Sequence, residues 1–385
     1  MGRMATPGTV SQAGEIRSAR IESLRALAAL AVLEGHAFGY GHGWRAGDIY
    51  GSFLHRTLLG GGSAVLVFFA LSGYLLFWPF AKRWFGPGDP IDLRRYAINR
   101  VLRILPLYYV AVIVVLLIQE HGGTFGEWWR FATLSENFSL TTLGRIDGPL
   151  WSVIVEIHFY ALLPLFAYFL ARATRRNSSR AVAALLAIGL AGALFRHWAV
   201  HQDYATARLL RFSLPGTFFF FVPGMLVAML RLRWEEQRPR LVTGVLAWPG
   251  VWLLAAVPFW AYHFYRYPDW PAAVGSFLIV AACVLPLRES RIVRALDWRP
   301  LAVLGVASYS IYVWHLPLVH ALSDATHWGF PALLTLSLAV CCTVALVSYR
   351  VIEAPFLALR RRWSPSAARQ AAPDEAAPAL SPASA

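Results

Sequence analysis

An arginine and a histidine lie eleven positions apart in an otherwise apolar stretch near the start of the chain. Residues 21–40 read IESLRALAALAVLEGHAFGY, and about 20 apolar residues are enough for a helix to cross a bilayer. At about 100° per residue, Arg25 and His36 project from one face of that helix, roughly 16 Å apart along its axis. Ionisable groups at such depth usually face a bundle interior or a cavity. The pair therefore predicts a polar seam inside a membrane helix.

Two interpretations of this pair stand at this point. In the first, Arg25 extends to the lipid headgroups and His36 only forms a hydrogen bond between helices. In the second, the imidazole does chemistry, because histidine exchanges protons near neutral pH. Glu34 points to another side of the helix, and no role is assigned to it.

A carboxylate in the fourth apolar stretch offers a partner for the histidine. In GPLWSVIVEIHFYALLP, residues 148–164, Ser152, Glu156 and Tyr160 follow one another at intervals of four and share a helix face. Counted at about 1.5 Å per residue, Glu156 lies roughly 9 Å below the outer edge of the membrane, and His36 falls at about the same level. If the two helices adjoin, Glu156 would orient His36 as a base.

Four arginines crowd the start of the third apolar stretch. Arg94, Arg95, Arg100 and Arg103 stand in RRYAINRVLRILPLYY, residues 94–109, and the last two share a face. Such a cluster serves either as an anchor on anionic lipids or as a clamp for phosphates, which suits the fixed fork of donors on arginine.

Hydroxyl groups occur in two further apolar stretches. Ser72 and Gly73 lie in FFALSGYLLF, residues 68–77, where small residues let helices approach closely. In LGVASYSIYVWHLPL, residues 304–318, Ser308, Tyr312 and His315 share one helix face. These stretches would add hydroxyls and a second imidazole to the bundle interior.

The composition requires most of these stretches to be membrane helices. The 385-residue chain is 57% hydrophobic and 15% charged, whereas soluble domains are about 25% charged. The net charge of +14 comes from basic residues that flank apolar runs instead of forming one basic face, so we expect no nucleic-acid partner. The three cysteines lie in apolar runs without metal-ligand spacing, so we expect free thiols and no metal site.

The apolar runs predict an all-α, polytopic membrane protein with ten transmembrane helices. They are centred on residues 21–40, 62–81, 101–119, 150–171, 181–198, 213–230, 241–262, 271–287, 300–320 and 329–349. With the N-terminus cytoplasmic, the inner segments hold 26 Lys and Arg residues and the outer segments 8, which places both termini in the cytoplasm.

This topology sets the domain organisation and the location. Residues 1–20 are expected to be a disordered N-terminal segment, residues 21–360 the membrane domain, and residues 361–385 a disordered tail rich in Ala, Pro and Ser. The plasma (inner) membrane is the expected multi-pass location. The outer connection at 120–149 is a candidate wall for whatever binds from outside.

The order of these motifs resembles that of the acyltransferase-3 family over about residues 20–360. The matching elements are the spaced Arg25 and His36, the FFALSGYLLF stretch, Arg100-Val-Leu-Arg103, PLWSVIVEIHFY, LGVASYSIYVWHLPL and the closing IEAPF. Members of this family are integral membrane acyltransferases that modify bacterial polysaccharides, lipopolysaccharide, peptidoglycan and some macrolide sugars. Some members carry an extra extracytoplasmic hydrolase-like domain, and this sequence is expected to lack it.

The resemblance implies a role for each motif. It implies that His36 is catalytic with Arg25 as its partner, and that Arg100 and Arg103 bind acyl-CoA; from their positions alone, Arg94 and Arg95 are added as candidates for acyl-CoA and Glu156 as the residue that orients His36. Ser72, Trp151, Ser152, Ser308 and Tyr309 stand in motifs that match the family and are the candidate substrate-binding residues.

The expected function is transfer of an acyl group, expected to be acetyl, from acyl-CoA to a hydroxyl of a carbohydrate or glycosylated acceptor. His36 would be the general base, with Ser72, Tyr309 or Arg25 as candidate donors to the oxyanion. The alternative is a proton-coupled membrane transporter, because intramembrane His, Glu and Arg also build proton relays. The chain shows no inverted repeat that would support transport.

Overall fold

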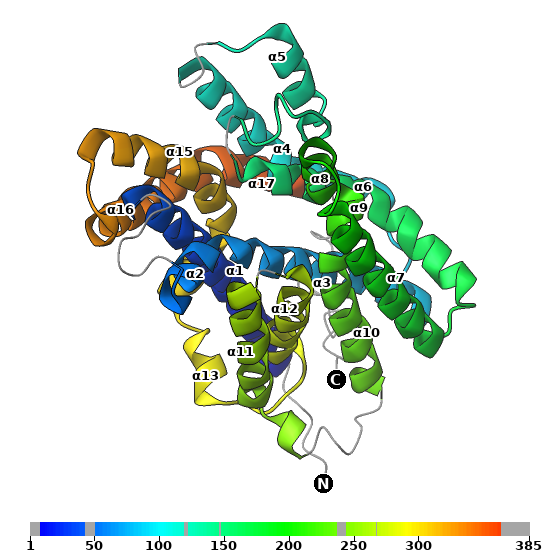
Figure 1. The fold of residues 1–385 in the computed structure, drawn as a ribbon. Helices are drawn as coiled ribbons and strands as arrows, with labels where there is room; N and C mark the ends of the chain where they lie inside the picture. Colours follow the sequence, from blue (N-terminus) through cyan, green and yellow to red (C-terminus); the bar gives the residue numbers. More distant parts are fainter. Residues whose placement is uncertain are drawn as a thin grey trace, which may run out of the picture.

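The computed structural model describes residues 8–42, 51–118, 122–145, 148–236, 244–266 and 268–362. These ranges are helical, with no β-strand among them, which confirms the predicted all-α class (Figure 1). The helices, in chain order, are α1 (Gly8–His42), α2 (Phe53–Leu59), the 3₁₀ helix η2 (Gly60–Ala64), α3 (Val65–Phe85), α4 (Leu93–Ile118), α5 (Phe125–Ala132), η3 (Glu136–Phe138), α6 (Leu150–Ala173), α7 (Ser178–Ala199), α8 (Tyr204–Arg211), α9 (Leu214–Thr217), η4 (Phe218–Phe220), α10 (Val222–Glu236), η6 (Val245–Ala247), α11 (Pro249–Arg266), α12 (Asp269–Val284), α13 (Arg291–Ala295), α14 (Arg299–Val306), α15 (Ser308–Thr326), α16 (Phe330–Ser348), the π-helix η7 (Tyr349–Glu353) and α17 (Ala354–Arg362).

Helix α1 is the element on which the C-terminal helices assemble. It packs against α14, α15 and α16 on one side and against η2 on another. A Cβ added to Gly35 would come within 2.7 Å of the backbone nitrogen of Gly62, so α1 and η2 touch backbone to backbone just before His36. Small side chains give the same close fit to α15 and α16, where Ala29, Ala37 and Ala345 are buried together. The position of His36 is therefore fixed by packing on both sides.

A second group of helices is built on α3. This helix packs against α10, α6 and α12, and a Cβ on Gly73 would lie 2.1 Å from the carbonyl oxygen of Phe221. Stacked aromatic rings fill the space beside this contact, with ring centroids 3.9 Å apart between Phe159 and Phe221 and 4.8 Å apart between Phe69 and Phe221. The glycine of the Ser-Gly motif thus serves packing, while the serine beside it is available for other contacts.

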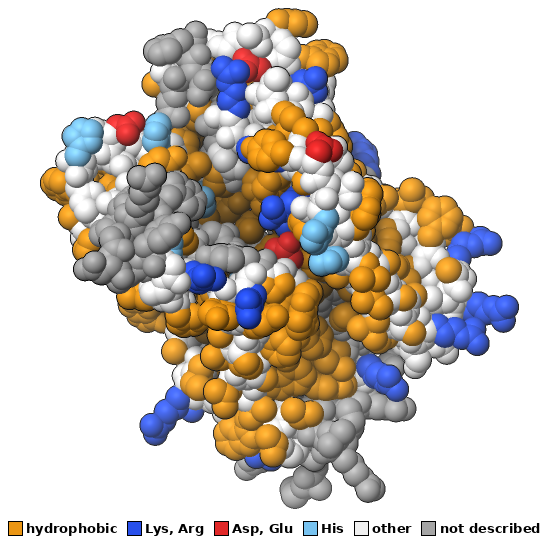
Figure 2. All heavy atoms as spheres, in the orientation of Figure 1, with side chains coloured by type: hydrophobic (Ala, Val, Ile, Leu, Met, Phe, Trp, Pro, Cys, Tyr) orange, Lys and Arg blue, Asp and Glu red, His pale blue; other side chains and the backbone are white. Residues whose placement is uncertain are grey.

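The outer surface of the bundle is apolar, as a membrane protein requires. Leu186, Leu190 and Leu194 are more than half exposed along one face of α7, and hydrophobic side chains cover much of the face seen in Figure 2. Among the described residues, six helices are long and apolar enough to span a membrane, or seven if one bent pair counts as a single span. The chain is a multi-pass membrane protein, whereas ten spans and the orientation of the termini stay predictions.

The expected ninth span, residues 300–320, is not one straight helix. It is broken at Ala307 into α14 and α15, which meet at an angle of 72°. The break places the N-terminus of α15, where the first N–H groups have no partner within the helix, inside the bundle next to Arg25. Broken membrane helices are tolerated where they are buried in protein or line a cavity, and α15 does both.

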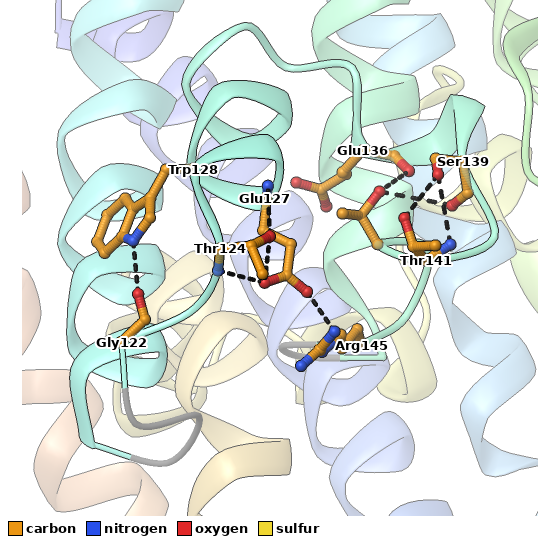
Figure 3. A network of polar contacts seen from close by, with 9 residues as sticks. Gly122, Thr124, Glu127, Trp128, Glu136, Ser139, Thr141 and Arg145 are labelled. Atoms are coloured by element: carbon orange, nitrogen blue, oxygen red, sulfur yellow. Dashed lines mark hydrogen bonds and ion pairs between the residues drawn. The ribbon is translucent and has the colours of Figure 1, made fainter.

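Residues 122–145 form a separate segment between α4 and α6, which we call the α5 segment (Figure 3). Thr124 and Glu127 cap α5 reciprocally, and the Trp128 indole donates to the carbonyl of Gly122 (2.6 Å). The carboxylate of Glu127 also pairs with Arg145 at the far end of the segment. These local bonds hold the segment together above the end of α4.

The predicted disorder at 1–20 and 361–385 is not tested by the structure. Residues 1–7 and 363–385 lie outside the described residues. Helix α1 begins at Gly8, ahead of the predicted start of the membrane domain, and α17 ends at Arg362.

Candidate functional site

Two neighbouring cavities lie between the α1 group and the α3 group, and Figure 2 shows a hollow in the middle of the molecule with charged and histidine side chains among hydrophobic ones. We call the first the arginine cavity. Its volume, including space open to its surroundings, is about 710 Å³. Its polar lining comes from Arg25, Ser72, Arg100, Arg103, Ser152, Glu156, Tyr160, Ser308, Tyr309 and Tyr312.

Each wall of the arginine cavity comes from a predicted motif. Helix α1 contributes Arg25, whose Nε donates to Ser308 Oγ at the start of α15 (3.1 Å). Helix α15 is joined to α4 where Tyr309 donates to the carbonyl of Ile104 (2.9 Å). Helix α4 is joined to α6 where Tyr96 donates to the carbonyl of Tyr160 (3.0 Å). The structure thus brings together residues that lie almost 290 positions apart in the chain.

Glu156 is held inside the arginine cavity by two hydroxyl groups. Ser72 Oγ and Tyr160 OH both donate to its Oε1, the second at 2.5 Å. A carboxylate in a bundle interior needs such donors. Ser72 therefore serves the glutamate, and the Ser-Gly motif and the Trp-Ser…Glu motif form one connected unit.

Arg100 and Arg103 face the same cavity without an ion pair, and the carboxylate of Glu353 interacts with Arg103 and Arg25 only through space. No hydrogen bond or ion pair within the described part of the chain involves either guanidinium, and the Nε of Arg100 is buried and unpartnered. The guanidinium of Arg100 lies over the rings of Tyr96 and Tyr160, at 6.0 and 5.8 Å from their centroids. With Arg25, they give this cavity three guanidinium groups against one carboxylate.

Arg94 and Arg95 are not part of the cavity. Both are exposed near the start of α4, where the backbone N–H of Arg95 donates to Asp92 (2.9 Å). The reason is geometric, since α4 enters the bundle only one to two turns later, at the level of Arg100. A role for them in binding stays a prediction.

The second cavity contains the histidine, and we call it the histidine cavity. Its lining is Val32, His36, Gly62, Val65, Leu143, Gly144, Gly148, Pro149, Trp151, Arg208, Phe212 and Tyr312. It therefore collects residues from α1, η2, α3, the α5 segment, α6, the end of α8 and α15. Trp151, expected at the substrate site, lies here and not in the arginine cavity.

His36 is oriented by a backbone carbonyl and a second histidine. Its Nδ1 lies 2.8 Å from the carbonyl oxygen of Val32 and 3.3 Å from Nε2 of His315. Nδ1 of His315 lies 2.6 Å from the carbonyl of Tyr312 and must carry a proton to bond it, so Nε2 of His315 is an acceptor. We assign the proton of His36 to Nδ1 from this network, which leaves Nε2 of His36 with a free lone pair.

The expected contact between His36 and Glu156 is not found. Each has other partners, and they line different cavities that share only Val65 and Tyr312. Tyr312 forms the boundary, with its hydroxyl 2.7 Å from Ser152 Oγ and 3.2 Å from the carbonyl of Pro149. Equal depth in the membrane did not bring the two side chains together, because Val65 at the start of α3 and Tyr312 of α15 separate their cavities.

The sequence indicated some of the remaining site residues and missed others. The shared face of Ser308, Tyr312 and His315 was visible, although nothing in it paired His315 with His36. Arg208 and Phe212 were not singled out, since they stand in a short stretch with no apolar periodicity of membrane length. Glu34 lies away from both cavities, packed on the backbone of Gly61, with its Oε1 buried and unpartnered.

Comparison with known proteins agrees with the motif order. Peptidoglycan O-acetyltransferase OatA of Listeria monocytogenes is 24% identical over 363 residues, covering 87% of this chain and 55% of that protein. O-acetyltransferase OatA of Staphylococcus aureus is 24% identical over 350 residues, covering 81% of this chain and 56% of that protein. The chain thus spans about half the length of the curated relatives it matches. No solved structure gives a significant match.

The match to a family model covers most of the chain. The model described as "Acyltransferase domain" aligns with residues 18–350, a range that contains both cavities and every residue named at the site. The chain therefore belongs to the acyltransferase-3 family.

Proposed function

We propose that this protein is a membrane O-acyltransferase that moves an acyl group, acetyl in the first instance, from acyl-CoA to a hydroxyl group of a carbohydrate. The observation that carries the proposal is the arginine cavity beside the histidine cavity. Unpaired guanidinium groups inside a helix bundle are costly without an anionic ligand. The phosphates of coenzyme A would supply the missing negative charge for Arg100 and Arg103.

The donor would lie with its phosphates at the arginines and its thioester near Tyr312. Arg25 lines the same cavity and is held by Ser308 at the start of α15. Because Arg25 and His36 stand roughly 16 Å apart along α1, Arg25 would bind the donor at a distance from the reacting carbonyl carbon. This arrangement assigns Arg25 to binding of the donor.

His36 would then act as the general base from the other cavity. Its free Nε2 accepts the proton of the acceptor hydroxyl while the hydroxyl oxygen attacks the thioester carbonyl carbon. The carbon–sulfur bond breaks, the ester forms, and the thiolate of coenzyme A takes the proton back from the imidazolium. His315 orients His36 in this scheme, and Glu156, through Ser72 and Tyr160, shapes the donor cavity instead of orienting the base.

The proposal also includes the topology and the acceptor class. Ten transmembrane helices with both termini in the cytoplasm would place the arginines at the cytoplasmic side of a plasma membrane, where acyl-CoA is made. The relatives are named for O-acetylation, in one case of peptidoglycan, which supports a cell-wall or other surface glycan as acceptor. The transporter alternative is not proposed, because the family match is to acyltransferases.

Substitution of His36 tests the catalytic proposal. Purified protein in nanodiscs is supplied with acetyl-CoA and a soluble glycan fragment, and release of coenzyme A and glycan acetylation are both measured. His36→Ala should lower transfer by about 10²–10⁴-fold, the usual contribution of a general base. His201→Ala, which changes an exposed histidine at the end of α7, is the matched control. Transfer by His36→Ala at the control rate would exclude His36 as the base.

A further inference from the structure

The histidine cavity has features of its own that the acyl transfer step does not use. Besides His36 and the boundary residue Tyr312, it is lined by the aromatic side chains of Trp151 and Phe212 and by one charged side chain, Arg208. A further wall is formed by Gly144 of the α5 segment and by Gly148, which follows that segment in the chain. No carboxylate is among the residues that line this cavity in the described part of the chain.

Arg208 is fixed at the cavity with donors to spare. Its Nη1 donates to Tyr204 OH (2.8 Å) and its Nη2 to the carbonyl of Leu143 (3.2 Å). A guanidinium has five N–H donors, so these two bonds leave three without a protein partner, including the buried Nε. Both bonds go to uncharged groups, and no ion pair of the described residues involves Arg208.

The acidic side chains described in the elements around this cavity are engaged elsewhere. Asp269 pairs with Arg196, Glu127 pairs with Arg145, and Asp203 caps the first turn of α8. Glu136 accepts a bond from the hydroxyl of Tyr108 (2.6 Å). The positive charge of Arg208 is therefore left to the cavity and to whatever binds there.

The two aromatic rings are held in place from behind. Trp151 and Phe212 contact each other with ring centroids 4.7 Å apart at an angle of 59°. The amide nitrogen of Asn137, which is 1% exposed, donates to the backbone carbonyls of both residues, at 2.8 Å and 2.9 Å. This buried amide ties α6 to the end of α8 and gives the cavity a firm aromatic wall, and the C–H faces of a sugar ring pack well on such a wall.

We propose that the histidine cavity is the acceptor site and that it recognises a sugar bearing a carboxylate, with the ring against Trp151 and Phe212 and the carboxylate on Arg208. The proposal rests on the proposed function, since it makes the bound sugar the source of the hydroxyl that reaches His36. Among the described residues, a guanidinium without an ion pair and no carboxylate line this cavity, which favours an anionic sugar over a neutral one and disfavours a cationic amino sugar.

The test compares three soluble acceptors of the same length with one set of variants. The probes are an oligosaccharide that contains N-acetylmuramic acid, a neutral N-acetylglucosamine oligomer and a cationic glucosamine oligomer. The variants are Arg208→Gln, Arg208→Lys and Arg208→Glu, with Arg266→Gln as the matched control because Arg266 is an exposed arginine outside the cavity. Binding of each probe without donor and the KM of each in the transfer assay are measured.

The wild-type protein and Arg266→Gln should bind the muramic acid oligomer best and the glucosamine oligomer least. Arg208→Gln should weaken binding of the anionic probe by about tenfold or more, as expected for one lost charge-assisted hydrogen bond, and change the neutral probe less. The affinity of Arg208→Lys for the anionic probe should lie between the affinities of the wild-type protein and Arg208→Gln. Arg208→Glu should reverse the preference toward the cationic probe.

The outcomes separate this proposal from the proposed function. If Arg208→Gln and Arg208→Lys lose affinity equally for all three probes, or if Arg266→Gln loses the same affinity, the acceptor site at Arg208 is refuted even if transfer occurs. A wild-type protein that shows the charge preference in binding but never consumes acetyl-CoA would refute the proposed function and leave the carbohydrate site standing. Wild-type binding that does not distinguish the three charges would overturn the inference directly.

Discussion

At the scale of single residues, the site depends on a contact between two imidazoles. The ring centroids of His36 and His315 lie 5.0 Å apart, with the planes at 61°, and the carbonyl of Tyr312 fixes the proton of His315 on the far nitrogen. His315 is 1% exposed, so no solvent replaces this contact. Its effect is to keep the proton of His36 on Nδ1 and the lone pair of Nε2 directed away from the protein partners.

His315 is therefore predicted to be a positioning residue for the base. His315→Ala should lower kcat by about 10- to 100-fold, the range expected when a hydrogen bond to a group that becomes charged is lost, with little change in either KM. His315→Gln should recover much of the activity, because its side-chain oxygen can accept from Nδ1 of His36 at the place of the lost Nε2. If both variants have equal kcat values, or if KM rises as kcat falls, His315 acts only through packing.

The sequence predicted single residues better than the pairs they form. Helical spacing placed Arg25 and His36 on one face, and both do contact the same helix, at Ser308 and His315 of α15. The partner predicted for His36 was Glu156, whereas the true partner lies on a helix more than 270 positions later in the chain. Depth in a membrane orders residues along the bilayer normal only, and which helices adjoin depends on packing contacts such as Gly35 on η2.

At the scale of elements, the α5 segment contains two glutamates whose pKa values shift in opposite directions. Burial raises the pKa of Glu136 to about 8, partly offset by the bond from Tyr108. The hydrogen bond from the backbone of Thr124, with the bond from its hydroxyl and Arg145, lowers the pKa of Glu127 below its ordinary value. Glu136 is thus favoured in its neutral form and Glu127 in its charged form.

These shifts predict a stability maximum for the segment in mildly acidic solution. Between an ordinary pKa of 4.5 and about 8, folded Glu136 holds a proton that the unfolded chain has lost, so stability falls as the pH rises through this range, by up to about 5 kcal/mol. Below that ordinary value, stability falls as Glu127 is protonated and its bonds are lost. The thermal unfolding midpoint, measured from about pH 2 to pH 9, should show both limbs.

Glu136→Gln provides the matched variant for the alkaline limb. Glutamine has the same shape, can still accept from Tyr108 and does not ionise, so the decline between pH 5 and pH 8 should flatten while the acid limb is unchanged. An alkaline limb of the same slope in Glu136→Gln would mean that another group causes it.

The break in α14–α15 shows what hydropathy does not reveal about an element. Residues 300–320 form one continuous apolar run, so the sequence predicted one straight span. The turn at Ala307 follows a close contact, in which a Cβ on Gly305 would lie 1.8 Å from the carbonyl oxygen of Glu22 on α1. The run is therefore bent by its packing on α1, and the bend places Ser308 and Tyr309 in the arginine cavity.

At the scale of the whole molecule, ten spans require α1, α11 and α12 in addition to the six apolar helices and the bent pair, and α11 and α12 are the shortest of these. At about 1.5 Å per residue, these helices of 18 and 16 residues are roughly 27 and 24 Å long, slightly less than a hydrocarbon core of about 30 Å. They pack against each other, and Trp248, Tyr265 and Trp270 stand half-exposed at their ends. Aromatic residues at such positions mark the interfaces of a membrane, so we expect both helices to cross it.

Labelling of three engineered cysteines tests whether α11 and α12 cross the membrane. The background protein has Cys283, Cys341 and Cys342 replaced by alanine. Single cysteines are then introduced at three exposed positions: before α11 (Val245→Cys), at the end of α11 (Arg266→Cys) and after α12 (Arg291→Cys). A membrane-impermeant maleimide should label only the cysteine at 266 in intact cells, and the other two after permeabilisation. The arginines that flank 245 and 291 require these two ends to be cytoplasmic by the positive-inside rule. Labelling of all three from the same side would show that α11 and α12 do not span the membrane, and the ten-helix topology would be wrong.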